Sequence, residues 1–295
     1  MNVIVLLCYN DDKVSVNYIK GIINYDVLDV ILVIDNGSSK DKVHNLENEL
    51  NKINSKKIIF IKNENNLGYA KGNNTGIDYA LKNLHPNNII VSNTDVEYSE
   101  ETMKYAIDYL NKHDDCDMVS PKMVLPNGND GLIAWKLPKY WMTLWNASFL
   151  LKKFYNPQKY KEFTNDVCKV DVLPGSLLIA KADAWKTVGG FDEDTFLYGE
   201  ESLLAYKLRE NGKNTFVLTN VSYVHNHSTI INENVKSINS KMKLLLDANL
   251  IYNKKCLNTG VIRNFLYYFV FYLNLVLMSL VYSIKKIGRH KIEHI

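Results

Sequence analysis

Short apolar runs rich in Val and Ile alternate with longer amphipathic stretches over the first hundred residues. The runs lie at 3–7, 30–34, 58–61 and 89–91, and the segments between them are long enough for helices. Continuous apolar runs are typical of strands that are buried on both faces of a parallel sheet. Because crossovers between parallel strands are right-handed, the pattern predicts an α/β fold with a Rossmann-like, open and mostly parallel sheet flanked by helices.

Polar residues follow each of these runs. Tyr9 and Asn10 follow the first run, and polar segments at 35–38, 63–66 and 92–95 follow the other three. In open α/β sheets, ligands bind at the carboxyl ends of the strands. We therefore expect the four strand ends to line one site.

The alternation of strands and helices is interrupted between residues 121 and 165. Pro and Gly residues break this stretch, and three Trp residues are interspersed in it. We expect a long insertion or a loop region beside the site. A strand at 176–180 and helices at 182–187 and 200–211 follow, and the last helix ends at Gly212, a common terminating residue.

The pattern predicts a first domain at 1–230 and a helical extension at 231–295, in which residues 265–284 carry no formal charge. That length can span a bilayer. Arg263 precedes the run and a basic cluster at 285–291 follows it, which opposes a single span under the positive-inside tendency. A helix lying in the membrane interface fits both flanks. A buried helix or a contact in a homo-oligomer is the alternative.

The overall composition is that of a globular protein. Hydrophobic residues make up 46% of the 295 residues and charged residues 23%, and the net charge of +3 gives no indication of a nucleic-acid partner. The four Cys residues are isolated, which favours a reducing compartment, and the N-terminus lacks the basic start of a signal peptide. We expect a cytoplasmic protein that is peripheral at the inner face of the cell membrane.

Glycine-rich phosphate-binding motifs are missing from the sequence. No G-x-G-x-x-G follows the first strand, and no G-x-x-x-x-G-K-[ST] occurs. A divalent metal is the usual alternative for neutralising phosphate charge. Asp95, at the end of the fourth strand, is the best-placed carboxylate to hold one.

Five blocks of sequence carry a specific resemblance. They are Tyr9-Asn10, the segments 33–39, 66–77 and 93–95, and the segment 189–193 together with 198–201. In this order and spacing they resemble family 2 glycosyltransferases of the GT-A fold, in the rhamnosyltransferase-like branch of bacterial surface-polysaccharide enzymes. The resemblance covers roughly residues 1 to 229.

The resemblance implies a nucleotide-sugar donor and a set of residues that bind it: Tyr9, Asn10, Asp35, Asn66, Gly68, Lys71, Asn74, Asn93 and Gly175. Asp35 would accept a hydrogen bond from the nucleobase, although its segment is also a good Asx turn. Gly68 and Gly72 would let the nucleotide approach the backbone, and Gly175 would do the same for the donor sugar.

The resemblance also implies a divalent metal, Mg²⁺ or Mn²⁺. The segment 93–95 occupies the place of the family's DxD motif, with Asn93 in place of the first carboxylate, so Asp95 is the anionic ligand there. His225 and His227 lie in the segment that matches the family's His-containing closure. They are two residues apart on an extended segment and point the same way, so either could reach the metal. His225 is the first choice as the ligand, and His227 is the reserve.

An inverting transfer needs a carboxylate to deprotonate the acceptor hydroxyl group. The pair Glu200-Glu201 matches the family's Glu-Asp, whose second member is the base, and the match selects Glu201. Because neighbours on a helix point about 100° apart, only one of the two can face the substrate. For Glu200, a solvated first turn of a helix is a sufficient explanation.

The expected function is transfer of a sugar, with inversion, from a UDP- or dTDP-sugar to a hydroxyl group of a lipid-linked or growing glycan in bacterial surface-polysaccharide synthesis. A nucleotidylyltransferase would need a Gly-rich, Arg-containing loop after the first strand, and residues 9–12 contain none. A non-catalytic partner or scaffold of the same fold is the second alternative.

Overall fold

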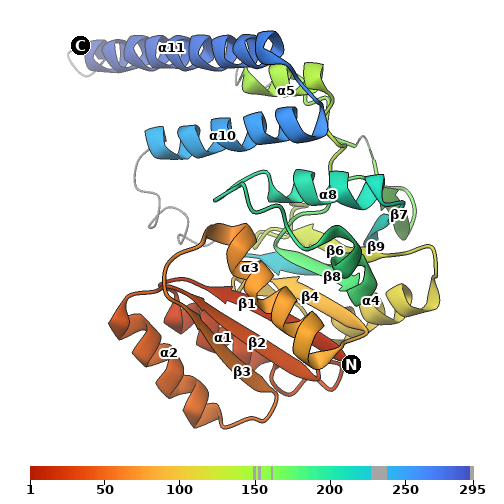
Figure 1. Ribbon diagram of the computed structural model, residues 1–295. Coiled ribbons are helices and arrows are strands. Elements are labelled where there is room, and N and C mark those ends of the chain that lie inside the picture. Colours follow the sequence, from red (N-terminus) through yellow and green to blue (C-terminus); the bar gives the residue numbers. More distant parts are fainter. Residues whose placement is uncertain (149–150, 152–153, 161, 227–237, 293–295) are drawn as a thin grey trace. The chain divides into compact units, whose positions relative to one another are not determined.

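The computed structural model describes residues 1–148, 151, 154–160, 162–226 and 238–292 (Figure 1). The chain forms two compact units. The sheet unit contains Met1–Leu137 and Tyr160–Ala248, and the helical unit contains Pro138–Lys159 and Asn249–Ile295. This division differs from a boundary at residue 230, because a segment from the middle of the chain joins the C-terminal helices.

Four parallel strands form the N-terminal half of the sheet, in the order β3-β2-β1-β4 (Figure 1). Their bounds are β1 (Asn2–Cys8), β2 (Val30–Asn36), β3 (Ile58–Asn63) and β4 (Asn88–Ser92). Each contains one of the apolar runs, and the carboxyl ends lie along one edge, as the sequence predicts.

The second half of the sheet is mixed rather than parallel. It contains β8 (Leu177–Lys181), β6 (Met118–Val124), β9 (Thr215–His225), β5 (Val96–Glu97) and β7 (Val167–Val170). β8 runs antiparallel to β4 and β6, while β6 and β9 are parallel, and β5 and β7 pair antiparallel with β9. β6 continues through Pro121, where its register shifts against β9. A bulge of this kind tolerates a proline inside a sheet.

Helices cover both faces of the sheet, and each face has its own buried apolar cluster. On one face lie α1 (Asp12–Ile22), α2 (Lys40–Ile53) and α4 (Glu100–Lys112). On the other lie α3 (Gly68–Tyr79), which continues into the short π-helix η1 (Ala80–Leu84), and α7 (Ala182–Val188) and α8 (Glu200–Glu210).

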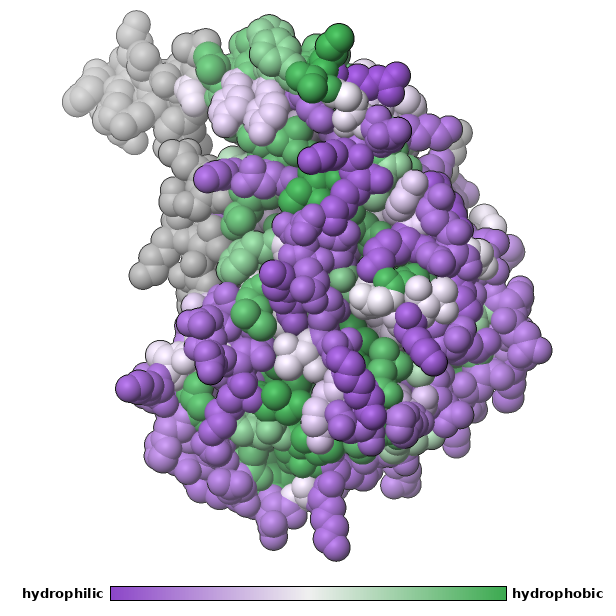
Figure 2. Space-filling view, in the orientation of Figure 1, coloured by the Kyte–Doolittle hydropathy of each residue, from purple (hydrophilic) through white to green (hydrophobic). Residues whose placement is uncertain are grey.

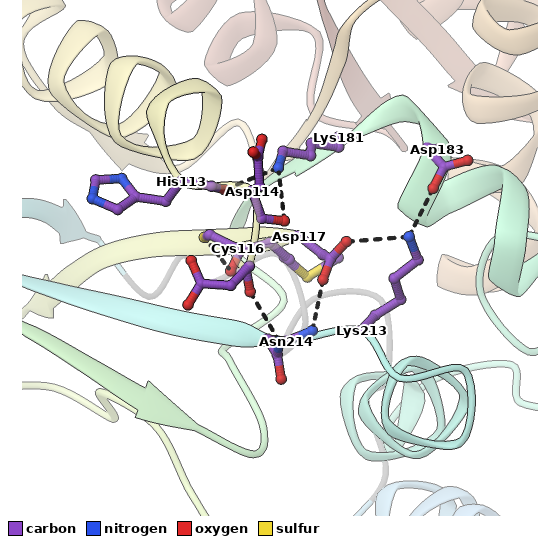
Figure 3. A network of polar contacts seen from close by, with 10 residues as sticks. His113, Asp114, Cys116, Asp117, Lys181, Asp183, Lys213 and Asn214 are labelled. Atoms are coloured by element: carbon purple, nitrogen blue, oxygen red, sulfur yellow. Dashed lines mark hydrogen bonds and ion pairs between the residues drawn. The ribbon is translucent and has the colours of Figure 1, made fainter.

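A polar network fixes the starts of β6 and β9 (Figure 3). The Lys213 ammonium group lies 3.2 Å from the Asp117 carboxylate and 2.7 Å from that of Asp183. Asp117 also accepts a hydrogen bond from the backbone N–H of Asn214. These contacts lie at the amino ends of the strands, opposite the expected site, and they hold the origin of β9, which carries His225 at its other end.

The helical unit contains α5 (Tyr140–Ala147), the end of α10 (Ile238–Cys256) and α11 (Val261–Ile292). The Tyr140 hydroxyl group donates to the Arg263 carbonyl at 2.6 Å, and the Ser148 hydroxyl group donates to Asn274 at 3.5 Å. α5 therefore lies along the first turns of α11. The helical extension is confirmed for the described residues, whereas α5 lies inside the stretch for which the sequence predicts loops.

The segment that contains α5 leaves the sheet unit at Leu137 and returns at Tyr160. Both of these residues form hydrogen bonds with Asp171. The Leu137 backbone N–H donates to the Asp171 carboxylate at 3.0 Å, and the Asp171 backbone N–H donates to the Tyr160 hydroxyl group at 3.0 Å. Asp171 thus holds both residues that flank the segment 138–159.

α11 exposes much apolar surface, visible in Figure 2 for the part of the helix that is coloured there. Val261–Ser279 is long and apolar enough to cross a membrane, and only a small part of it is buried. Tyr267, Phe271 and Asn274 are buried, while most other side chains of this stretch are exposed, including Val261, Ile262, Phe265, Phe269, Tyr272 and Val276.

Candidate active site

The loops after β1, β2 and β4 are joined by side-chain hydrogen bonds. The backbone N–H of Asn10 donates to the Ser38 hydroxyl group at 2.8 Å, and the Asn10 amide oxygen accepts from the backbone N–H of Ser39 at 2.9 Å. The Thr94 hydroxyl group donates to Asp11 at 2.9 Å. The structure thus brings together three of the strand ends that the sequence predicts to form one site.

Asp35 is held by its own turn. Its side chain is buried, and one carboxylate oxygen accepts a hydrogen bond from the backbone N–H of Ser38 at 3.3 Å. The other oxygen is buried without a hydrogen-bond partner among the described residues. A buried acceptor without a partner is costly in a folded protein. The Asx-turn role therefore holds, and one acceptor oxygen remains available for a ligand.

Asn36 connects the end of β2 to the start of α3. Its NH₂ group donates to the Asn66 side chain and to the Gly68 carbonyl, both at 3.1 Å, and its oxygen accepts from the Leu67 backbone N–H at 3.2 Å. Asn66 in turn accepts from the backbone N–H of Gly68 at 2.9 Å. The side-chain oxygen of Asn66 is therefore engaged within the turn that precedes α3.

Two glycines of α3 are explained by close packing within the protein. Gly68 has a φ of +81°, and a Cβ there would lie 2.4 Å from the Phe196 carbonyl oxygen. A Cβ at Gly72 would lie 2.6 Å from the Leu7 side chain. The approach of a nucleotide to the backbone at these positions stays a prediction. The side chain of Lys71, between them, is exposed.

The Asn74 side chain ties α3 to the loop that precedes α8. Its oxygen accepts from the Phe191 backbone N–H at 2.9 Å, and its NH₂ group donates to the Phe191 carbonyl at 3.1 Å and to Glu193 at 2.9 Å. A Cβ at Gly190 would lie 2.4 Å from the Asn74 oxygen, so the glycine makes this contact possible. The structure gives Asn74 a positioning role, and its contact with a donor stays a prediction.

Tyr69 joins three segments that are distant in sequence. Its hydroxyl group donates to the Gly175 carbonyl at 2.7 Å and lies 3.4 Å from the Asn93 side-chain oxygen. Its ring packs edge to face against Phe191, with 5.7 Å between the ring centroids. The sequence prediction missed Tyr69. The available signal was a hydroxyl-bearing ring inside the glycine-containing block 66–77.

The Glu201 side chain lies beside this contact. A Cβ at Gly175 would be 3.1 Å from a Glu201 carboxylate oxygen and 3.4 Å from the Tyr69 hydroxyl oxygen. Gly175 therefore lets the carboxylate approach the backbone, and the approach of a donor sugar to Gly175 stays a prediction. Burial raises the pKa of Glu201 above its usual value, and backbone amides of Glu201 and Gly175 oppose the rise.

Glu200 is buried, with 3% of its surface exposed, so the explanation as a solvated first turn is wrong. One of its carboxylate oxygens has no hydrogen-bond partner among the described residues. Burial raises its pKa, and the charge of Glu201 raises it further. Tyr198 and Gly199, just before this pair, both have positive φ, at +76° and +83°. Glycine adopts this conformation readily, so the backbone strain next to the two carboxylates lies at Tyr198.

Asp95 and His225 face each other across paired strands. Val96 of β5 pairs with His225 of β9, and the His225 Nε2 atom lies 3.3 Å from an Asp95 carboxylate oxygen. Both side chains are nearly buried. A carboxylate oxygen suits either Mg²⁺ or Mn²⁺, and an imidazole nitrogen suits Mn²⁺ better than Mg²⁺. Among the described residues, no group of three or more His, Cys, Asp or Glu side chains is arranged to hold a metal ion. A cation here would need further ligands from a substrate and water. His227 lies outside the described residues.

Comparison with known families settles the class of the chain. Residues 3–170 match the model of the family described as Glycosyl transferase family 2. The chain belongs to glycosyltransferase family 2. The narrower assignment to the rhamnosyltransferase-like branch stays a prediction.

Relatives of this family 2 chain include a curated protein, the low-salt glycan biosynthesis hexosyltransferase Agl10 of Haloferax volcanii. The two are 25% identical over 169 residues, which are 57% of this chain and 52% of that protein. The match thus spans about half the length of the curated relative.

Solved structures share the fold. The structure of GalNAc-T7 with UDP, GalNAc and Mn²⁺ has a TM-score of 0.60 at 16% identity, covering 77% of this chain and 44% of that chain. The mannosyltransferase PcManGT from Pyrobaculum calidifontis, in complex with GDP-Man and Mn²⁺, has a TM-score of 0.59 at 12% identity, covering 96% and 75%. S. aureus TarS 1-349 in complex with UDP has a TM-score of 0.56 at 15% identity, covering 93% and 70%. The fold is GT-A, with a mixed sheet flanked by helices.

Proposed function

We propose that this family 2 chain transfers a sugar, with inversion, from a UDP- or dTDP-sugar to a hydroxyl group of a lipid-linked or growing glycan in bacterial surface-polysaccharide synthesis. The observation that carries the proposal is the Tyr69 contact. Its hydroxyl group lies between Asn93, two residues before Asp95, and Gly175, against which Glu201 lies. This contact supports the proposal that Asp95, as a metal ligand, and Glu201, as a general base, act in one site.

Glu201 is the proposed general base. It would take the proton from the acceptor hydroxyl group as that oxygen attacks the anomeric carbon. Burial raises the pKa of this carboxylate, which makes it a stronger base than an exposed one. The backbone amides of Glu201 and Gly175 favour the ionised form.

Asp95 and His225 are the proposed protein ligands of a Mg²⁺ or Mn²⁺ ion, with His227 as the reserve. The ion would neutralise charge on the departing nucleoside diphosphate. The two ligands lie 3.3 Å apart, close enough to share one ion after a small adjustment. GalNAc-T7 and PcManGT have structures with Mn²⁺, which supports a metal of this kind.

The donor nucleotide is proposed to lie across the ends of β1, β2 and β4. The buried Asp35 oxygen without a partner would accept from the nucleobase, and the exposed Lys71 would face the phosphates. Tyr9, Asn10, Asn66, Gly68, Asn74, Asn93 and Gly175 complete the proposed set. GDP-Man in PcManGT, and UDP in GalNAc-T7 and TarS, support a nucleotide-sugar donor.

α11 is proposed to lie in the interface of the cytoplasmic face of the membrane, where it would keep the enzyme near a lipid-borne acceptor. The support is its exposed apolar stretch Val261–Ser279, followed in sequence by the basic cluster at 285–291.

The test is a screen of nucleotide sugars for donor hydrolysis and transfer with Mg²⁺ and Mn²⁺. Wild-type protein should turn over at least one UDP- or dTDP-sugar, and Asp95→Ala and Glu201→Gln should each lower kcat by at least about 100-fold, since each removes a group that acts in the transition state. Asp130→Ala, which removes an exposed carboxylate paired with Lys122, is the control. Wild-type protein that binds none of these donors in the presence of metal would refute the proposal.

A further inference from the structure

The charge of the chain is divided sharply between the two units. The helical unit contains eleven Lys and Arg residues and a single acidic residue, Glu293. The sheet unit contains 24 basic and 31 acidic residues. At neutral pH the formal charges are therefore +10 and −7, and the overall +3 conceals a strongly cationic module.

Four of the eleven basic residues of this module come from the middle of the chain, in the segment Pro138–Lys159. Between Asp130 and Glu162 the sequence has no acidic residue and six lysines. Among its described residues, the part within the helical unit, Pro138–Lys159, exposes four large apolar side chains: Trp141 (51%), Leu151 (42%), Phe154 (87%) and Tyr155 (60%). Trp and Tyr are the residues that favour a membrane–water interface.

This mid-chain segment is fixed to α11 and folded on itself. The Arg263 guanidinium lies 5.4 Å from the centre of the Tyr140 ring, in addition to the hydrogen bond between these residues. The Trp145 ring N–H donates to the Tyr155 carbonyl at 2.8 Å, and the two rings meet edge to face. The exposed rings therefore belong to a structured part of the unit that contains α11.

We infer that Pro138–Lys159 is a second membrane contact, and that it docks, together with α11, on a bilayer that carries anionic lipid. This inference rests on the interfacial placement proposed for α11. Apolar side chains would enter the interface while the lysines and arginines bind lipid phosphates.

The chemistry distinguishes a bilayer from other occupants. A nucleic acid would use the positive charge but would leave Phe154, Leu151 and the α11 side chains in water. A second copy of the chain would bring a net charge of +10 against +10, which opposes association through this unit. An anionic bilayer satisfies both the charge and the apolar side chains.

The test is vesicle flotation of the full-length protein with phosphatidylcholine alone and with phosphatidylcholine containing phosphatidylglycerol. Three double variants are compared with wild type: Trp141→Ser with Phe154→Ser, Phe265→Ser with Phe269→Ser on α11, and the control Tyr105→Ser with Leu132→Ser. The control residues are also exposed and large, but they lie in the sheet unit. Unchanged thermal unfolding shows that each variant is folded.

We expect wild type and the control to bind the anionic vesicles at least about tenfold more strongly than the neutral ones. The variant with Trp141 and Phe154 replaced should lose at least about tenfold in partition to anionic vesicles, because two large side chains no longer enter the interface. A loss with the α11 variant supports the placement of α11 on which the inference rests.

Three results would overturn the inference. The first is that the variant at Trp141 and Phe154 binds vesicles as strongly as wild type. The second is that wild type binds neutral and anionic vesicles equally. The third is that light scattering shows a changed oligomeric state for the variant at Trp141 and Phe154 while its vesicle binding is unchanged. If only the α11 variant loses binding, the proposal for α11 stands while this one fails. Flotation measures binding and requires no turnover. If the protein binds vesicles but has no transferase activity, the proposed catalytic function is refuted and the inferred membrane contact is not.

Discussion

The hydroxyl group of Tyr69 lies between the strand end that carries Asp95 and the turn that supports Glu201. It binds Gly175, which is 106 residues away, and approaches Asn93, which is 24 residues away. We expect this contact to hold the two proposed functional residues, Asp95 and Glu201, in their relative positions. Its loss should affect the alignment of the site more than the affinity for either substrate.

Tyr69→Phe should therefore lower kcat by about two- to tenfold with little change in the KM for the donor, since a neutral hydrogen bond contributes about 0.5–1.5 kcal/mol. The ring contact with Phe191 is retained. Steady-state kinetics with a soluble acceptor measures both constants. Tyr252→Phe is the matched control, because the Tyr252 hydroxyl group also donates to a main-chain carbonyl, at 3.0 Å, in the helical unit. Equal kinetics for Tyr69→Phe and wild type would contradict the positioning role.

Glu200 should make the stability of the protein depend on pH. Its pKa is raised in the folded state, so the folded protein keeps a proton that the unfolded chain has already released. Its contribution to the free energy of unfolding is therefore fully present below the pKa of the unfolded state and falls as the pH rises towards the folded pKa. Glu200→Gln lacks this titration.

The Tm of Glu200→Gln minus that of wild type should thus increase as the pH rises from 4.5 towards 8, measured by thermal unfolding. Glu210→Gln, which changes an exposed side chain on the same helix, should show no such trend. A difference between Glu200→Gln and wild type that does not vary with pH would show that the buried carboxyl group does not titrate as argued.

The positions of Asp35 and Asp95 at strand ends were predictable from the sequence, because each follows an apolar run, whereas their roles in a site stay predictions. Tyr69 and Asn36 were not predicted, because their importance arises from hydrogen bonds between segments that are distant in sequence. Glu200 was interpreted as solvated because sequence alone does not show which side of the first turn of a helix is covered.

At the scale of elements, the start of α3 depends on how closely it meets the loop before α8. The Tyr69 backbone N–H donates to the Phe196 carbonyl at 2.9 Å, and Gly68 has no side chain to obstruct this approach. The position of α3 and the loop that leads to Glu200 are therefore coupled.

Gly68→Ala should be much more destabilising than Gly128→Ala. Both glycines have a φ of +81°, but a Cβ at Gly128 meets nothing within 4 Å, whereas one at Gly68 would lie 2.4 Å from a carbonyl oxygen. Gly128→Ala should cost about 1–2 kcal/mol from backbone strain alone. Gly68→Ala should cost more than that and also weaken donor binding, measured by thermal unfolding and calorimetry. Equal losses of stability would contradict the steric argument.

The first four strands were predictable because each is a continuous apolar run between helices. β6 was obscured because Pro121 lies inside it, and only the register shift against β9 accommodates that residue. α5 was missed because its packing partner, α11, lies more than a hundred residues further along the chain. Its stability comes from tertiary contact rather than from a local pattern.

At the scale of the whole molecule, the sequence predicts a sheet domain followed by helices, and it also contains the uneven distribution of charge. It does not show that residues 138–159 belong with the C-terminal helices, because compact units are defined by contacts and not by order along the chain. Once the structure shows which residues form the helical unit, the numbers of its basic and acidic residues give its positive charge.

The position of Asp171 has a practical consequence for protein engineering. Because Asp171 binds both Leu137 and Tyr160, a short Gly and Ser linker could replace residues 138–159 while Leu137 and Tyr160 stay in place. α10 should be kept, since Leu246 and Ala248 are buried and a Cβ at Gly199 would lie 3.2 Å from that of Ala248. A chain of residues 1–137 linked to 160–256 is thus a rational starting point for crystallisation without detergent.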